Sequence, residues 1–136
     1  MELEELIENL DLEEMNYFYH ITGKGYGDDI INEGLFLLEK ELRTTTIPLP
    51  IEFLKNPEEY CESEHTTTLV KREEMVIIGC EKGEEKYIVE KLDDSKWIGN
   101  QKFDYMVSNR YILGYIDLET FEVTYNYEYE YGGRHV

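Results

Sequence analysis

The stretch YFYHIT at residues 17–22, followed by GKGYG at residues 23–27 and DDIINEGL at residues 28–35, is the most informative part of this chain. Its aromatic and β-branched residues predict a first strand, the glycines predict a bend, and the third segment predicts a short helix. The strand therefore ends in an imidazole and a hydroxyl, those of His20 and Thr22. Such an ending beside a glycine-rich bend can hold a small polar ligand at the edge of a cleft.

The short helix expected after the bend has a signal at each end. Asp28 or Asp29 can accept hydrogen bonds from the free N–H groups of its first turn. Gly34 stands where a left-handed residue commonly ends a helix. Ile30 and Ile31 are then the side chains that anchor the helix on the core.

Hydrophobic periodicity predicts further elements on either side of a poorly patterned middle region. Leucine and isoleucine at helical spacing, interleaved with glutamate, predict an acidic amphipathic helix within residues 1–14 that packs as a cap on the sheet. Residues 74–80 and 86–90 each favour a strand, and Gly83 between them favours a tight turn, so a β-hairpin is expected. Residues 39–68 contain prolines and threonine triplets and predict no definite structure.

Strands are also expected near the C-terminus. Residues 103–107 and 111–118 are rich in aromatic and aliphatic residues, and residues 121–131 alternate between apolar side chains, mostly tyrosine, and polar or acidic ones. An aromatic ladder can stack nucleic-acid bases, but such platforms lie in basic grooves, and here the opposite face is acidic. A half-buried final strand that covers the core is preferred, with residues 132–136 as a flexible tail.

The chain has 136 residues, of which 41% are hydrophobic and 13% aromatic. This is enough apolar material for one core, so a single α+β domain is expected over residues 1–136. No segment approaches the roughly 18 consecutive apolar residues of a membrane span, and the N-terminus lacks the basic and apolar regions of a secretory signal. Because the two cysteines form no disulfide framework, the sequence predicts a cytoplasmic protein with no membrane partner.

Thirteen Lys and Arg residues against 31 Asp and Glu residues give a formal charge of −18, from 13 − 31. Direct nucleic-acid binding is opposed, because it needs basic side chains that neutralise phosphates. An anionic membrane is disfavoured for the same reason. The negative field attracts basic grooves, polyamines or divalent cations, or serves solubility alone.

Three other motifs match known sites only in part. The glycines of residues 23–27 are spaced unlike the dinucleotide-binding G-x-G-x-x-G, and aspartates follow where a pyrophosphate would lie. Cys61 and His65 have i, i+4 spacing, but a structural zinc needs four ligands, so no metal site is expected. Asp93 and Asp94 lack the spacing of a calcium loop and favour a solvated turn.

The segment YHIT at residues 19–22, with II at residues 30–31 and EGL at residues 33–35, resembles the opening of the ADP-ribosyltransferase-like fold. In that family a strand of the form hydrophobic-His-x-Thr/Ser is followed by a helix that ends in Ile-x-x-Gly-Leu. The resemblance implies an α+β domain with a split, mostly antiparallel sheet, a few short helices and a nicotinamide cleft.

The histidine of this motif grips the ribose of NAD in the family. The resemblance therefore implies that His20, together with Tyr19, Thr22 and Gly23, binds NAD or ADP-ribose as a cofactor or ligand. A nicotinamide nucleotide is then the small-molecule partner of this chain.

The segment NRYI at residues 109–112 is similar to the place where many members carry their catalytic glutamate just before Tyr-Ile, and Arg110 stands at that position. A carboxylate there stabilises the cationic ribose that forms as nicotinamide leaves, whereas an arginine opposes that charge. Residues 35–50 also contain no tyrosine for the middle member of the family's His-Tyr-Glu set. A relative that binds NAD, ADP-ribose or a protein without turnover is expected, with its catalytic residues unassigned.

Two other classes of function are compatible with the sequence. The charge fits an acidic interaction protein that blocks a basic groove on a partner protein, as nucleic-acid mimics of phages and mobile elements do. The third class is an adaptor domain that dimerises through a sheet edge such as the final strand.

The charge imbalance predicts a salt effect on stability whatever the function. Screening should relieve repulsion among the acidic residues, so the melting temperature should rise from low salt to about 0.3 M, where the Debye length is roughly 5–6 Å. Differential scanning calorimetry over a series of NaCl concentrations measures this change. A flat or falling melting temperature would mean that the acidic residues are paired or well separated.

Overall fold

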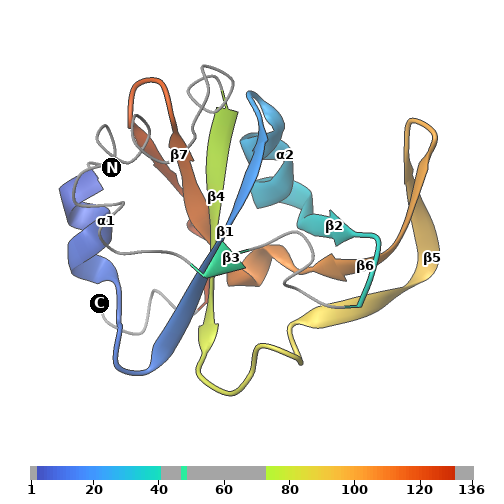
Figure 1. The fold of residues 1–136 in the computed structure, drawn as a ribbon, viewed down its shortest axis with the longest axis horizontal. Helices are drawn as coiled ribbons and strands as arrows, with labels where there is room; N and C mark the ends of the chain where they lie inside the picture. The colour runs from blue at the N-terminus through green and yellow to red at the C-terminus, as the bar shows by residue number, and fades with distance from the viewer. Residues whose placement is uncertain (1–2, 41–46, 49–72, 131–136) are drawn as a thin grey trace.

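The computed structural model describes residues 3–40, 47–48 and 73–130, and Figure 1 shows their arrangement. These residues form two short α-helices, eight strands and a 3-10 helix. In chain order they are α1 (Leu3–Asn9), β1 (Met15–Gly23), α2 (Tyr26–Glu33), β2 (Leu35–Leu37), β3 (Ile47–Pro48), β4 (Glu73–Glu81), β5 (Val89–Ile98), β6 (Gln101–Val107), η3 (Asn109–Tyr111), β7 (Ile112–Asp117) and β8 (Val123–Tyr125).

The strands form two antiparallel sheets. The larger sheet has the order β3-β1-β4-β7-β8, and the smaller sheet has the order β2-β6-β5. In Figure 1 the smaller sheet extends to one side of the larger sheet, and α1 lies on the other side. The α+β class with antiparallel strands and a few short helices, expected from the sequence, is confirmed.

Strand β4 lies in the middle of the larger sheet and is buried on both faces over residues 74–80. Its alternating side chains divide between two hydrophobic clusters, with Met75 and Ile77 in the first and Val76 and Ile78 in the second. Each fully buried aliphatic side chain contributes about 1.5–3 kcal/mol. This one strand therefore links both halves of the core.

The first cluster lies between α1 and one face of the larger sheet. Leu6 of α1 is 1% exposed and belongs to this cluster, and three neighbouring apolar side chains pack against it. They are Leu3, Ile7 and Leu10. The helix therefore caps the sheet, as its periodicity predicts.

The acidic N-terminal helix is shorter than the range 1–14 expected for it. It ends at Asn9, and the Asp11 carboxylate accepts hydrogen bonds from the backbone N–H groups of Glu13 and Glu14, both at 3.2 Å. Local bonds from a side chain to the backbone compete with helical hydrogen bonds. The residues after α1 therefore form a turn that leads into β1.

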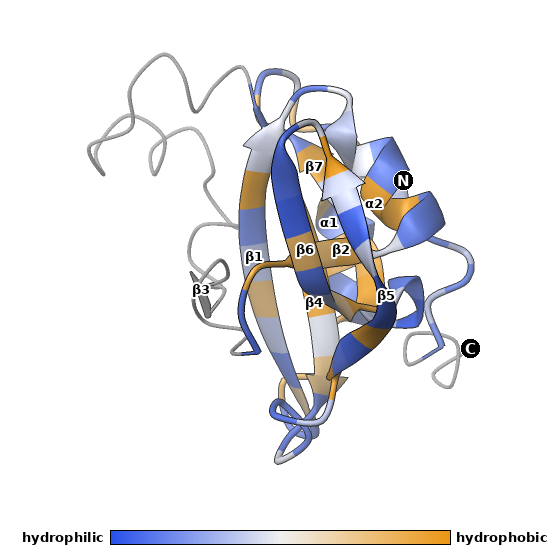
Figure 2. Cartoon of the chain, turned by 90° about the vertical axis from the view of Figure 1, so that its right-hand side faces the viewer, coloured by the Kyte–Doolittle hydropathy of each residue, from blue (hydrophilic) through white to orange (hydrophobic). Residues whose placement is uncertain are grey.

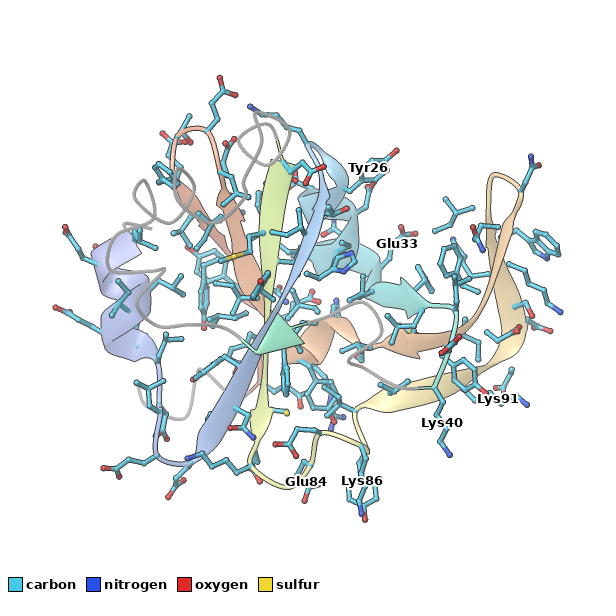
Figure 3. All side chains as sticks on the ribbon, in the orientation of Figure 1. Tyr26, Glu33, Lys40, Glu84, Lys86 and Lys91 are labelled. Atoms are coloured by element: carbon cyan, nitrogen blue, oxygen red, sulfur yellow. The ribbon has the colours of Figure 1, made fainter. Side chains whose placement is uncertain are left out.

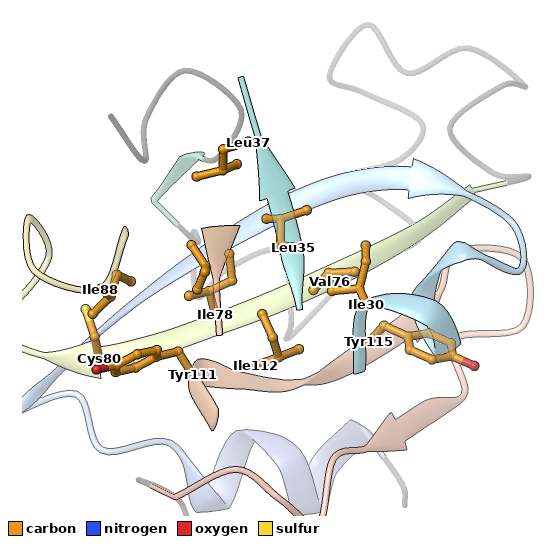
Figure 4. Packing of buried hydrophobic residues seen from close by; sticks show 11 residues of the cluster. Ile30, Leu35, Leu37, Val76, Ile78, Cys80, Ile88, Tyr111, Ile112 and Tyr115 are labelled. Atoms are coloured by element: carbon orange, nitrogen blue, oxygen red, sulfur yellow. The ribbon is translucent and has the colours of Figure 1, made fainter. Parts of the chain in front are cut away.

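The second cluster fills the space between the larger sheet, α2 and the smaller sheet (Figure 4). Helix α2 contributes Ile30, β2 contributes Leu35 and Leu37, and β6 contributes the fully buried Val107. Figure 2 shows β5 and β6 largely in hydrophilic colours, with few apolar bands. The smaller sheet is therefore attached through a narrow apolar edge, and its β5–β6 hairpin stands away from the core (Figure 1).

The hairpin expected from residues 74–80 and 86–90 does not form. The turn at Gly83 is present, with φ of 91° and a hydrogen bond of 3.0 Å from the N–H of Glu84 to the carbonyl of Glu81. The strands on its two sides belong to different sheets, because β1 and β7 already pair with the two edges of β4. Strand β5 pairs with β6 instead, so the chain leaves the larger sheet after this turn.

The final strand is also shorter than the alternation of residues 121–131 predicts. Strand β8 ends at Tyr125, and the next side chain, Asn126, is 2% exposed. Its amide donates hydrogen bonds to two backbone carbonyls at 2.9 and 2.8 Å. Tyr127, expected on the apolar face, is 92% exposed. The hydrogen bonds from the buried Asn126 amide to the backbone therefore end β8 at Tyr125, although the alternation in the sequence continues.

The N-terminus of α2 is capped from another element. Gly25 precedes the helix at φ 96°, and the Glu74 carboxylate on β4 accepts hydrogen bonds from the N–H groups of Gly25 at 3.1 Å and Gly27 at 2.8 Å. Asp28 instead accepts a hydrogen bond of 2.8 Å from the hydroxyl of Tyr115. The predicted aspartate cap is wrong, because a carboxylate distant in sequence occupies these N–H groups.

The C-terminal end of α2 agrees with the sequence prediction. Gly34 has φ 98°, and its N–H bonds to the carbonyl of Ile30 at 2.8 Å. A Cβ at this position would lie 2.6 Å from the Met106 methyl and 2.7 Å from the Val107 carbonyl oxygen. Glycine alone fits both the conformation and the space, so the chain turns directly into β2.

Several expectations fall outside the described residues. They concern most of residues 39–68, the pair Cys61 and His65, and the tail at 132–136. The two aspartates at 93–94 are described, and they lie exposed within β5, not in a turn.

Removing the Glu74 carboxylate should destabilise the fold. Glu74→Ala deprives the N–H groups of Gly25 and Gly27 of their acceptor. Gly27 is buried, and a buried unsatisfied donor costs about 1–3 kcal/mol, so the free energy of unfolding should fall by about that amount. Glu74→Gln keeps an acceptor oxygen and should lose less. Urea unfolding followed by circular dichroism measures both, with Glu73→Ala as the matched control. Equal losses for Glu74→Ala and Glu73→Ala would contradict the cap.

Candidate functional site

A cavity of about 540 Å³ opens between α2 and the β5–β6 hairpin, and His20 and Thr22 line it from the end of β1. Both lie on the strand face that carries Phe18 into the second cluster. In the sheet, His20 pairs with Val76 of β4, which in turn pairs with Tyr115 of β7. His20 and Thr22 therefore share a face of β1 with a core residue, and this face meets the open cavity at its polar end.

The other two residues expected beside the ligand are not among the described residues that line this cavity. Tyr19 lies on the opposite face of β1 and packs against the first cluster, because the period of two in a strand separates it from His20. Gly23 ends β1 next to Tyr26, and a Cβ added to it would lie 3.1 Å from Cδ2 of that ring. Gly23 therefore supports a residue of the cavity wall.

Helix α2 forms one wall of the cavity with Tyr26, Asp29 and Glu33. Their spacing of three and four residues puts them on one face of the helix. Figure 3 shows Tyr26 and Glu33 projecting from α2 on the side of the hairpin. This wall therefore presents one aromatic ring and two carboxylates to a ligand.

The β5–β6 hairpin forms the facing wall with Lys96, Trp97, Ile98 and Phe103. The ammonium of Lys96 lies 5.4 Å from the ring centroid of Phe36 on β2, which also lines the cavity. The distance is that of a cation–π contact. This wall therefore combines a cation with aromatic and aliphatic surface.

The mouth of the cavity gathers exposed apolar side chains. Seven large hydrophobic side chains are exposed within the described residues, and four of them line this cavity. They are Tyr26 at 58%, Leu38 at 46%, Trp97 at 61% and Ile98 at 49%. Grouped exposed apolar surface on a soluble protein marks a site for a ligand or a partner.

Sequence reasoning missed the hairpin wall. The aspartates at 93–94 predict a solvated turn, whereas they lie within β5, the strand that also carries Lys96 and Trp97. A signal was present in the lone tryptophan of the chain, Trp97, set in a polar segment next to Gly99. An amphipathic aromatic residue of this size, preceded by four polar residues and followed by Ile98 and a glycine, favours a binding role.

Arg110 lies in η3 and is held by its own neighbours. Its Nε is 3.5 Å from a carboxylate oxygen of Glu130, and its guanidinium donates a hydrogen bond of 3.0 Å to the hydroxyl of Tyr111. The described lining of the cavity does not include it. The carboxylates that do line the cavity are Asp29 and Glu33. They belong to α2, whereas the resemblance expects a carboxylate at the position of Arg110 in η3.

The charges of the cavity are unequally divided. Asp29 and Glu33 stand against Lys96, whose Nζ is 3.9 Å from Oε1 of Glu33. Because both side chains of that pair are substantially exposed, it contributes about 0–1 kcal/mol. The His20 imidazole and the Thr22 hydroxyl add hydrogen-bonding groups. The site suits a ligand with flat rings and several polar groups.

Other chemistries find less support in the described residues. Within residues 3–40, 47–48 and 73–130, no three His, Cys, Asp or Glu side chains are grouped to hold a metal ion. Cys80 is completely buried, and burial, reinforced by nearby Glu85, raises the pKa of its thiol to about 12. Its thiolate is scarcely populated at neutral pH. No helix in this part of the chain combines the length and the apolar character needed to cross a membrane.

No protein-family model matches this chain, and neither a curated protein nor a solved structure shows significant similarity to it. The candidate site therefore rests on its own geometry. That geometry is a cavity with a polar strand end, an acidic helix wall and an aromatic hairpin wall.

Proposed function

We propose that this chain is an ADP-ribosyltransferase-like domain that binds NAD or ADP-ribose in the cavity beside His20. One observation carries the proposal. His20 and Thr22, the polar residues of the hydrophobic-His-x-Thr segment, line an open cavity next to α2, the helix that Gly34 and Leu35 follow. Two of the four residues that the resemblance implies as ligand contacts thus line the cavity.

The dimensions and chemistry of the cavity support a nucleotide ligand. A volume of about 540 Å³ falls within the range of small-molecule sites. The imidazole and the hydroxyl of β1 can bond to ribose hydroxyls, and Tyr26 and Trp97 offer ring faces for stacking on a base or a nicotinamide. A ligand of this class therefore has partners for the imidazole, the hydroxyl and the aromatic rings of the cavity.

The departures from the family pattern favour binding over turnover. Arg110 stands where the resemblance expects a catalytic carboxylate, and it is engaged with Glu130 and Tyr111. The carboxylates among the described lining residues are Asp29 and Glu33 on α2, and neither stands at the position where the resemblance expects the catalytic one. We therefore assign no catalytic residue and place the ligand at His20.

Isothermal titration calorimetry with NAD and with ADP-ribose tests the proposal. The wild type should bind one or both, and His20→Ala should weaken binding about tenfold or more, because a hydrogen bond in a desolvated site is lost. The control is Tyr127→Ala, which removes a ring that is 92% exposed and outside the cavity lining, and it should bind as the wild type does. Absence of binding heat from both ligands with the folded wild type would sink the proposal.

A second candidate function is a role as an acidic protein that blocks a basic partner. It is favoured by α1 and the turn after it, where Glu4, Glu5, Glu8, Glu13 and Glu14 are exposed. No Lys or Arg precedes Lys24 in the sequence. This acidic surface lies on the side of the larger sheet opposite the cavity (Figure 1), so the two functions can be separated by mutation.

A complex with a basic partner protein should weaken steeply as NaCl increases, because exposed charges are screened. Replacing Glu4, Glu5 and Glu8 together by Gln should weaken it further, whereas His20→Ala should leave it unchanged. Fluorescence anisotropy of the labelled partner measures the dissociation constant. A complex indifferent to both ionic strength and the triple substitution would exclude this role.

A further inference from the structure

The cavity is polarised between its two walls. The α2 wall carries the carboxylates of Asp29 and Glu33, and the hairpin wall carries the ammonium of Lys96. Lys96 is the sole Lys or Arg among the described lining residues. An anionic group of a ligand is therefore repelled from one wall and attracted to the other.

We infer that Lys96 binds the diphosphate of the nucleotide and makes the cavity select ligands that carry two phosphates. The inference rests on the proposed function and adds the orientation of the bound nucleotide in the cavity. The diphosphate lies against the hairpin, and the ribose next to it lies against His20 and Thr22.

The position of Lys96 supports this role. It stands in β5 opposite Phe103, just after the register of the β5–β6 ladder shifts. Its ammonium lies over the ring of Phe36, at 5.4 Å from the centroid, and 3.9 Å from Oε1 of Glu33. The second distance is too long for a hydrogen bond, so the donors of the ammonium are not committed to the carboxylate. A phosphate can take them without breaking a strong pair.

Three other groups that attract anions, all outside the described lining of the cavity, are engaged. The N–H groups at the start of α2, an ordinary phosphate site, are bonded to the carboxylate of Glu74. Lys24 pairs with Asp117 at 3.5 Å and Glu119 at 2.8 Å. Arg110 pairs with Glu130. Lys96 is therefore the cation that remains for a diphosphate in the described cavity.

A ligand series read by calorimetry tests the inference. ADP-ribose and NAD have two phosphates, nicotinamide mononucleotide has one, and nicotinamide riboside has none. Lys96→Gln should weaken NAD and ADP-ribose about ten- to a hundredfold, the loss expected for a charge-assisted hydrogen bond. It should change the affinity for the riboside by less than about threefold. Lys96→Arg should keep most of the affinity, because its guanidinium also binds phosphate.

The matched control is Lys102→Gln on the same hairpin. Lys102 is exposed, pairs across the ladder with Trp97 and does not belong to the described lining. It carries the same charge change and should bind NAD as the wild type does. A loss equal to that of Lys96→Gln would show a general effect of charge and overturn the inference.

The outcomes separate this inference from the function on which it rests. If the wild type binds neither NAD nor ADP-ribose, the proposed function fails. If the wild type binds them and Lys96→Gln binds them equally well, Lys96 does not contact the diphosphate and the proposed function stands. An equal loss for the riboside and for NAD would mean that Lys96 acts through the shape of the hairpin, which also overturns the inference.

Discussion

The buried contact between α2 and the larger sheet is the constraint on which the site depends. Gly27 lies so close to β4 and β7 that an added Cβ would fall 2.6 Å from the Tyr115 ring and 2.7 Å from the Glu74 carboxylate. That carboxylate in turn binds the free N–H groups of the helix. Because the helix is held here, Ile30 enters the second cluster, and Glu33 is left facing the hairpin. The cavity is the space between this fixed helix and the smaller sheet that follows from Gly34 (Figures 1 and 4).

Much of the fold was predictable because its signals are local. The aromatic run of β1, the apolar run of β4 and the glycine that ends α2 each depend on a few adjacent residues, and each lies where the pattern predicts. Strand pairing was not predictable in this way. Residues 86–90 follow β4 after the tight turn at Gly83, yet they cannot pair with β4, because β1 and β7 occupy both edges of that strand. Asn126 likewise ends β8 through bonds to carbonyls of residues 109 and 112, which no alternation of tyrosines reveals.

The candidate site was predictable only at the end of β1. His20 and Thr22 were expected there, and they share a strand face that meets the cavity, whereas Tyr19 points to the other face because strands alternate. Lys96 and Trp97 come from a hairpin more than seventy residues further along the chain, and only the pairing of β6 with β2 brings them opposite α2. The sequence alone does not show which strands pair, so it could not show that Lys96 and Trp97 lie opposite α2.

The central claim is that a nicotinamide nucleotide occupies the space between α2 and the β5–β6 hairpin. The most direct measurement is a titration of the ¹⁵N-labelled protein with NAD, followed through backbone amide chemical shifts. If NAD binds there, the largest shift changes should fall at the end of β1, on α2 near Glu33 and around Trp97 on β5, that is, in the helix and in both sheets. Shift changes confined to α1 and β8, or none at saturating NAD, would contradict it.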